Sequence, residues 1–335
     1  MELRDLRIFV CVVDERSFSA AGRRLHLAQS GVSDGVARLE RELGARLLER
    51  GRSGSSPTAQ GAVLLRWARR LISSADRARE EVRAAERGSA PTIRAGFLPT
   101  ITPLVLPGFL AGIRALPAPA SVRVTEGLAP PLLEQVRDGR LDLAVIFFPA
   151  DEVPGVEFVE VGERPLCVIV EGDVELARRR SVPLSTLSRH EWVTFPPHNP
   201  GRMWLDTACA AAGFVPRIAA EVETPVQQRI FVEAGIGVAM VPMGGAVALH
   251  AAPGVAEVRL EGPLPRFRIG YGHSPEQAGP GTDTARRVLE SVLDRLEPDG
   301  GGFETPRRKR SLVVDRSEAV ATMRQAGSTK RGDRG

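Results

Sequence analysis

The residues best suited to do chemistry in this chain lie near its start, between Ser17 and Glu42. Hydroxyl, amide and guanidinium side chains alternate there with two short apolar segments. Such side chains form hydrogen bonds with phosphate oxygens and with the edges of bases. The candidate contact residues are Ser17, Ser19, Arg23, Gln29, Ser30, Gly31, Ser33, Asp34 and Arg38, followed by Arg50 and Arg52. Their types point to contact with a nucleic acid.

Two short helices must position these side chains. Apolar residues recur at steps of three and four, which places them on one face of each helix. They are Phe18, Ala21 and Leu25, then Val32, Val36, Leu39 and Leu43. We expect Ser19 and Ser30 to cap the two helices and Gly44 to end the second. Two helices joined by a tight turn, here at Ala28-Gln29, can present the second helix to a DNA major groove. The spacing alone fits any small helical hairpin equally well.

A longer match separates these alternatives. Residues 3–50 resemble the start of LysR-type transcriptional regulators, in register and without a gap. The matching residues are Leu6, Phe9, Ser17, Phe18, Ala20, Ala21, Leu25, Gln29, Ser33, Leu39, Glu40, Leu43, Gly44 and Leu47, followed by Pro57, Thr58 and Gly61. The resemblance implies a homodimeric or homotetrameric regulator that binds double-stranded promoter DNA and a small organic effector.

Residues 1–58 are therefore expected to form an all-α winged helix-turn-helix domain. Residues 3–14 should be its first helix, since one helical face carries Leu6, Phe9, Val10 and Val13. The glycine- and serine-rich residues 50–56 are typical of a wing. Arg50 and Arg52 there would meet phosphates, which adds affinity without selecting a sequence.

The second helix of the pair departs from the family at Asp34-Gly35, where basic or amide side chains are common. Glycine inside a helix costs ~1 kcal/mol relative to alanine, and an aspartate that faces phosphate is unfavourable. Two explanations stay open. Either Asp34 accepts a hydrogen bond from a cytosine amino group in an unusual operator, or this winged helix-turn-helix domain binds DNA weakly.

A long helix is predicted over residues 58–86, because no proline or turn signal interrupts it. Apolar residues alternate at steps of four and three along it, which is the spacing of a coiled-coil seam. The expected dimerisation residues are Leu64, Ala68, Leu71, Ala75, Ala78 and Val82. The alternative is a helix folded back on its own domain. In the family this helix joins the DNA-binding domain to the effector domain, so residues 59–90 are expected to be linker and hinge.

Residues 91–297 are expected to form an α/β domain. Strand-like segments 92–97, 121–125 and 141–148 alternate with helical segments 104–113 and 132–138, which is typical of a parallel sheet. The same region resembles the effector domain of the family. The resemblance implies that this domain is divided into two lobes, as in type II periplasmic binding proteins. Lobe I is expected at residues 91–164 and 266–297, and lobe II at residues 165–265. The basic tail, residues 298–335, is expected to be disordered.

The resemblance also implies an effector site between the two lobes. The corresponding positions are Thr100, Thr102, Phe147, Thr194, Phe195, His198 and Thr224. For each of them, ordinary capping or core packing is the alternative. Leu98 and Ala129 stand where the family often has a hydroxyl. This predicts a cleft with apolar walls, which suits a small organic molecule with one polar head better than a bare inorganic anion.

Charge supports the division between head and body. Residues 1–90 hold 17 Lys and Arg against 12 Asp and Glu, whereas residues 91–305 hold 19 against 26. A basic head on an acidic body suggests that only the head approaches a polyanion. The absence of an apolar leader or spanning segment predicts a cytoplasmic protein with no membrane partner.

No catalytic or cofactor motif stands out in the sequence. The five histidines are scattered, and neither a P-loop nor a nucleophile elbow is present. We therefore expect no enzymatic activity, cofactor or metal. Cys11, Cys167 and Cys209 lack metal-ligand spacing and are expected to be reduced, buried thiols, with a redox pair between the last two as the alternative. A solute-binding protein and an α/β enzyme are the other classes considered.

Overall fold

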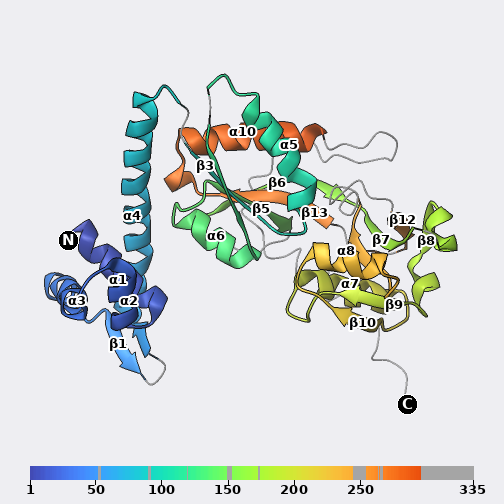
Figure 1. Cartoon of the computed structure of the whole chain (residues 1–335), viewed down its shortest axis with the longest axis horizontal. Helices are drawn as coiled ribbons and strands as arrows, with labels where there is room; N and C mark the ends of the chain where they lie inside the picture. The colour runs from blue at the N-terminus through green and yellow to red at the C-terminus, as the bar shows by residue number, and fades with distance from the viewer. Residues whose placement is uncertain are drawn as a thin grey trace, which may run out of the picture.

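The computed structural model describes residues 1–295 except 52–53, 90–91, 119, 149–152, 173, 244–253, 263 and 265–266. A small helical head at the N-terminus continues into one long helix, which leads to a larger α/β body in two lobes (Figure 1). This arrangement confirms the predicted fold class. The predicted tail, residues 298–335, lies outside the described residues.

The head contains three helices and a two-stranded antiparallel wing. The helices are α1 (Leu3–Glu15), α2 (Phe18–Leu25) and α3 (Gln29–Leu43), and the strands are β1 (Leu48–Gly51) and β2 (Gly54–Pro57). The core of the head gathers around Leu6, Phe9, Val32 and Leu39, all almost fully buried. Apolar periodicity therefore predicted these four residues correctly, whereas Leu43, predicted on the same face of α3, is 45% exposed.

The predicted N-caps of α2 and α3 were each wrong by two residues. Ser17, not Ser19, precedes α2, and its hydroxyl accepts from the Ala20 N–H at 3.2 Å. Helix α3 begins after Ala28 without any side-chain cap, so that Ser30 lies inside the helix. Ser17 has the extended backbone that capping requires, which a residue inside the helix lacks. Gly44 ends α3 in the left-handed conformation, as predicted.

Gly35 lies where α3 passes close to α1. A Cβ atom at this position would be 2.8 Å from Ile8 Cδ1 and 3.3 Å from an Asp5 carboxylate oxygen. The close approach of the two helices therefore accounts for a glycine that propensity alone disfavours. Packing within the head, and not recognition of an unusual operator, therefore explains why residue 35 is a glycine.

Helix α4 (Ala59–Glu86) is capped by Thr58, whose hydroxyl accepts from the Gly61 N–H at 3.0 Å. Two residues of its predicted dimerisation seam are buried inside this subunit. Leu64 is 8% exposed and Ala68 0%, because both pack into the core of the head. The prediction that Leu64 and Ala68 contact a second subunit was therefore wrong, because the head of the same subunit buries them. Beyond them Leu71, Ala78 and Val82 are exposed and Ala75 is half-buried.

Lobe I is a five-stranded mixed sheet with helices on both faces (Figure 1). Its strands run in the order β4 (Val122–Glu126), β3 (Ile93–Phe97), β5 (Leu143–Phe148), β13 (Phe267–His273) and β6 (Glu157–Arg164). The helices are α5 (Thr102–Arg114), α6 (Ala129–Arg137) and α10 (Pro280–Arg295), with a 3₁₀ turn at Pro275–Gln277. Strands β4, β3 and β5 are parallel, as the alternating pattern predicts, whereas β13 is antiparallel to β5 and to β6.

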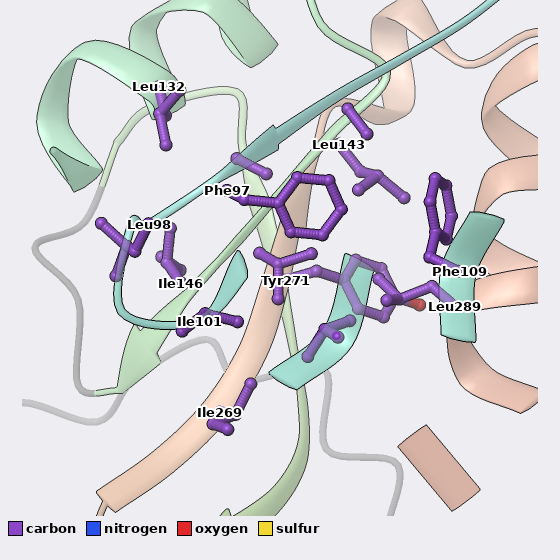
Figure 2. Packing of buried hydrophobic residues seen from close by; sticks show 14 of the residues in the cluster. Phe97, Leu98, Ile101, Phe109, Leu132, Leu143, Ile146, Ile269, Tyr271 and Leu289 are labelled. Carbon is purple, nitrogen blue, oxygen red and sulfur yellow. The ribbon is translucent and has the colours of Figure 1, made fainter. Parts of the chain in front are cut away.

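The core of lobe I is apolar and includes Leu98 (Figure 2). Leu98 lies beside Phe97, Ile101 and Ile146 and is 8% exposed. It therefore belongs to the packing of the lobe and not to a wall of the interlobe cleft. Ala129, the first residue of α6, also packs against this core.

Lobe II holds a four-stranded sheet and a separate parallel pair. The order of the larger sheet is β11 (Ala239–Pro242), β7 (Leu166–Glu171), β12 (Val255–Glu261) and β8 (Ser181–Pro183). The pair consists of β9 (Glu191–Thr194) and β10 (Arg217–Glu221). Helices α7 (Pro200–Ala211) and α8 (Pro225–Glu233) and two 3₁₀ turns, Glu175–Arg178 and Leu184–Leu187, complete the lobe. The chain enters lobe II from β6 and returns to lobe I at β13, so the expected double crossing is present.

Candidate functional sites

The exposed face of α3 gathers several of the predicted DNA-contacting residues. Gln29, Ser30, Asp34 and Arg38 are exposed along this helix. The Ser19 hydroxyl of α2 donates to Gln29 Oε1 at 2.9 Å, which orients the amide at the start of α3. This face presents an amide, a hydroxyl and charged groups, which can form hydrogen bonds with base edges.

The other predicted DNA-contacting residues of the head lie around this face. Arg23 is exposed in the last turn of α2, whereas Gly31 and Ser33 are half-buried on α3. The Ser17 hydroxyl is engaged as the cap of α2, so it serves the fold first. Arg50 lies in β1, whose register pairs it with Ser55. The side chain of Arg50 and the whole of Arg52 lie outside the described residues.

Arg38 is held by a carboxylate beneath it. Its Nε and Nη2 atoms donate to the two Asp5 oxygens at 3.0 and 2.5 Å, and Asp5 is buried. The hydrogen bond to Asp5 raises the pKa of Arg38. A guanidinium has five N–H donors, so the pair fixes the direction of Arg38 while leaving donors for an external acceptor.

The cleft between the lobes is lined mainly by apolar side chains. Of the predicted effector residues, Thr100 and Phe195 line it. Phe147 does not, but its ring packs edge-to-face on Trp204, which lines the cleft, with the centroids 5.0 Å apart. Met240 and Leu166 add apolar wall from lobe II. The predicted apolar character of the cleft therefore holds, although these residues supply it in place of Leu98 and Ala129.

The remaining predicted effector residues do not line this cleft. Thr102 donates its hydroxyl back to the Leu98 carbonyl at 3.2 Å. Thr194 is buried, His198 is exposed, and Thr224 forms the capping box of α8 with Gln227. Each of them serves helix ends, lobe packing or solvent contact, so the structure does not bring them together.

Arg229 is the cleft residue that sequence reasoning missed. It lies on α8, is 6% exposed, and lines the cleft close to Gln228, whose amide donates to the Val193 carbonyl at 3.0 Å. Arg229 is the one charged residue among those that line the cleft in the described part of the chain. The available signal was an arginine one turn after a helix start at Thr224-Pro225, where anions are favoured.

The interlobe cleft is nearly closed in this structure. Its free volume is about 30 Å³, which is the space of about one water molecule. Ligand pockets commonly enclose ~300–1,000 Å³. An organic ligand therefore enters this cleft only when the lobes or their side chains move apart.

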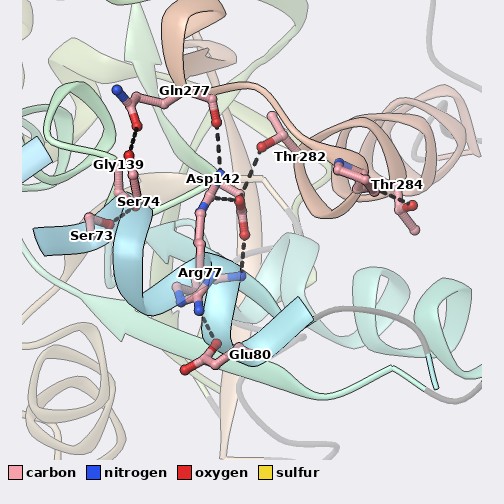
Figure 3. Close-up of polar contacts among 11 residues, drawn as sticks. Ser73, Ser74, Arg77, Glu80, Gly139, Asp142, Gln277, Thr282 and Thr284 are labelled. Atoms are coloured by element: carbon pink, nitrogen blue, oxygen red, sulfur yellow. Dashed lines mark hydrogen bonds and ion pairs between the residues drawn. The ribbon is translucent and has the colours of Figure 1, made fainter. Parts of the chain in front are cut away.

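Helix α4 is fastened to lobe I by a polar contact (Figure 3). Asp142, which is buried at the start of β5, accepts from Arg77 of α4, from the Thr282 hydroxyl at 3.0 Å and from the Arg94 N–H at 2.7 Å. The Ser73 hydroxyl of α4 donates to the Gly139 carbonyl. Through these contacts helix α4 packs directly against lobe I, which together with lobe II is called the sensor domain.

The three cysteines are free and buried. Burial raises the pKa of Cys209 to about 12 and that of Cys167 well above its usual value. Because the thiolate is the reactive form, neither residue has the low pKa of a redox-sensing cysteine. The described residues contain no group of three or more His, Cys, Asp or Glu that could hold a metal ion. Among the helices described, none is both long and apolar enough to cross a bilayer.

Comparison with known proteins identifies both parts of the chain. Residues 3–62 match the family described as "Bacterial regulatory helix-turn-helix protein, lysR family", and residues 86–297 match "LysR substrate binding domain". The chain is 32% identical over 302 residues to the HTH-type transcriptional regulator ShiR of Corynebacterium glutamicum (strain R), covering 89% of this chain and 100% of that protein.

Two further similarities extend this result. A probable hydrogen peroxide-inducible genes activator of Mycobacterium avium is 32% identical over 302 residues, covering 87% of this chain and 93% of that protein. The crystal structure of full-length CbnR complexed with target DNA superposes with a TM-score of 0.63 at 26% identity, covering 87% of this chain and 100% of that chain.

Proposed function

The chain belongs to the LysR family of DNA-binding transcriptional regulators and is not an enzyme, and from this membership we propose which surfaces bind DNA and effector. Residues 1–58 act as the DNA-binding head, with the exposed face of α3 in the major groove and the wing beside it. The observation that carries this assignment is the row of exposed polar residues from Gln29 to Arg38 on a winged helix-turn-helix. We also propose that the protein acts on DNA in the cytoplasm.

The effector is proposed to bind between lobe I and lobe II of residues 91–297. Thr100 and Arg229 are the polar groups for its head, and Phe195, Trp204 and Met240 are the walls for its body. Residues 59–90 then act as the linker that carries a change in the sensor to the heads. The contacts of Arg77 and Ser73 with lobe I support this role.

The test of the DNA-binding proposal is fluorescence anisotropy with duplex DNA from just upstream of the gene itself. Gln29→Ala is expected to weaken specific binding by ~1–3 kcal/mol, because an amide bound to a base edge discriminates by that amount. Binding to a scrambled duplex should be unchanged. Equal losses on both duplexes would contradict base contact by Gln29.

The wing is expected to contact the DNA backbone. Arg50→Ala or Arg52→Ala should weaken binding to all duplexes alike and lower the salt dependence by about one ion per lost contact. Arg178→Ala, an exposed arginine of lobe II, is the matched control and should leave the salt slope unchanged. If only specific binding fell, the wing would be reading bases.

The exposed apolar stripe of α4 is proposed to form the subunit contact of a homodimer or homotetramer. Val63, Trp67, Leu71, Ala78 and Val82 are exposed at steps that keep them on one face of the helix. This stripe replaces Leu64 and Ala68, which the head uses itself.

Leu71→Asp should therefore dissociate the assembly in analytical ultracentrifugation, because a buried unpaired carboxylate is strongly unfavourable. Leu110→Asp on α5 is the matched comparison, since Leu110 is 42% exposed and Leu71 40%. If Leu110→Asp, and not Leu71→Asp, produces monomer, the contact lies between sensor domains.

A further inference from the structure

A second, larger cavity lies where three parts of the chain meet, away from the interlobe cleft. Its free volume is about 470 Å³, which falls within the ~300–1,000 Å³ of ordinary ligand pockets. The head contributes Val10 and Asp14 of α1, the linker contributes α4, and lobe I contributes β3, β4, α6 and the segment before β5. Unlike the interlobe cleft, this cavity is open without any movement of the protein.

The lining of this cavity, which we call the joint cavity, is strongly basic. It holds six arginines and three carboxylates. The arginines are Arg69, Arg79, Arg83, Arg94, Arg123 and Arg140, and the carboxylates are Asp14, Asp76 and Glu80. The linker helix supplies three of these arginines and lobe I the other three. Positive charge therefore accumulates from two sides of one hollow.

The carboxylates in the joint cavity are already paired: Asp14 lies 2.7 Å from Arg69, and Glu80 and Asp76 are each shared by two arginines. Glu80 forms ion pairs with both Arg94 and Arg123, the latter at 3.4 Å. Asp76 pairs with Arg79 at 3.1 Å and with Arg7 of α1 at 2.5 Å. One carboxylate that serves two guanidiniums leaves N–H donors and positive charge uncompensated.

Arg140 lies next to another arginine of this cavity, Arg69. Burial and the nearby Arg69 guanidinium lower the pKa of Arg140, despite the Asp138 carboxylate at 3.5 Å. A bound anion would relieve the repulsion between the two guanidiniums. The guanidinium forks match phosphate oxygens in pairs, which favours a phosphate-bearing ligand over a bulky apolar one.

We propose that the joint cavity is a second ligand site, separate from the interlobe cleft, for a small phosphorylated anion with at least two negative charges. A ligand there contacts lobe I and α4 together and lies beside α1 of the head. Its binding energy therefore depends on the angle between head and sensor. By reciprocal linkage, occupancy of the cavity alters the placement of the DNA-binding heads.

The test is isothermal titration of the full chain with pyrophosphate, at constant ionic strength set with sodium chloride and without DNA. Wild-type protein is expected to bind one pyrophosphate per chain. Arg123→Gln and Arg140→Gln should each weaken binding about ten-fold or more, the loss of a hydrogen bond between charged groups. Both side chains are partly exposed, so the variants should fold, which circular dichroism checks.

Two matched variants locate the site. Arg178→Gln, on the exposed surface of lobe II, and Arg229→Met, in the interlobe cleft, should bind pyrophosphate like the wild type. Absence of binding, or equal binding by all variants, would overturn the proposal. Arg123→Gln or Arg140→Gln that changed the sedimentation of the protein without weakening pyrophosphate binding would instead assign the cavity to a subunit contact.

Discussion

Replacement of Gly61 by alanine is expected to unfold the DNA-binding head. Gly61 is buried in the first turn of α4, and a Cβ atom there would lie 1.9 Å from the Leu47 carbonyl oxygen and 2.9 Å from its carbon. These are backbone atoms, which cannot rotate away. The same Leu47 oxygen accepts from the Thr58 N–H at 3.0 Å, so a shift of the helix also breaks this bond.

We expect Gly61→Ala to cost about 3 kcal/mol or more, as overpacking against backbone does. Urea denaturation followed by circular dichroism measures this loss, and operator binding should disappear with it. Gly31→Ala is the matched control, because no heavy atom beyond its own helix backbone and chain neighbours lies within 4 Å of its Cβ position. Alanine there should stabilise α3 by ~1 kcal/mol through helix propensity. A Gly61→Ala protein that unfolds like the wild type would contradict the close approach of α4 to Leu47.

Local patterns predicted the head because its packing is local. The apolar residues of α1 to α3 recur at helical spacing, and the structure buries Leu6, Phe9, Val32 and Leu39 together. The caps failed because several serines lie close together and only backbone conformation selects one. Gly35 could not be interpreted from propensity, since its cause is a contact with Ile8 on another helix.

The linker illustrates a limit of periodicity. Leu64 and Ala68 have the spacing of a coiled-coil seam, yet they are buried in the core of the head. The exposed apolar stripe of α4 begins instead with Val63 and Trp67. A sequence shows which residues are apolar but not which of two neighbouring surfaces buries them. Contacts of α4 with lobe I, such as Arg77 with Asp142, are long-range and carry no local pattern.

The interlobe cleft contains only some of the residues predicted to bind the effector. Thr100 and Phe195 line it, whereas Thr224 is used as a helix cap and Leu98 as core. Strand and helix order fixes where two lobes meet, because the chain crosses between them twice. Which side chains turn inward depends on how α8 packs on lobe II, and this packing brings Arg229 to the cleft wall.

Arg229 is therefore expected to decide the class of effector. Arg229 already has an ion pair with Glu233, 4.0 Å away on α8. Its guanidinium also lines a mainly apolar cleft and is 6% exposed, which favours a ligand of opposite charge, because the cleft excludes the water that would otherwise solvate it. Thr100 lines the same cleft and offers a hydroxyl to the same head group. We therefore expect the effector to be an organic acid with an apolar body, and its carboxylate to bind against Arg229.

Paired screening tests this expectation. Aromatic and branched carboxylic acids are compared with their neutral amides by thermal shift, and the best pair is measured by calorimetry. Arg229→Met keeps an apolar stem of similar length but removes the charge. This change should weaken binding of the acid by ~2–5 kcal/mol, the cost of removing one partner of a buried charge pair. Binding of the amide should change little. Thr100→Val should cost both ligands only ~1–3 kcal/mol through one unpaired polar group.

Leu98→Ser separates ligand binding from loss of stability. Because Leu98 lies in the core of lobe I, this change should lower the melting temperature without changing the preference for acid over amide. Acids and amides that bind wild-type protein equally well would show that Arg229 only supports the fold. Tight binding of bare sulfate in this cleft, insensitive to Arg229→Met, would contradict an organic acid, since an inorganic ion has no body for the walls formed by Phe195, Trp204 and Met240.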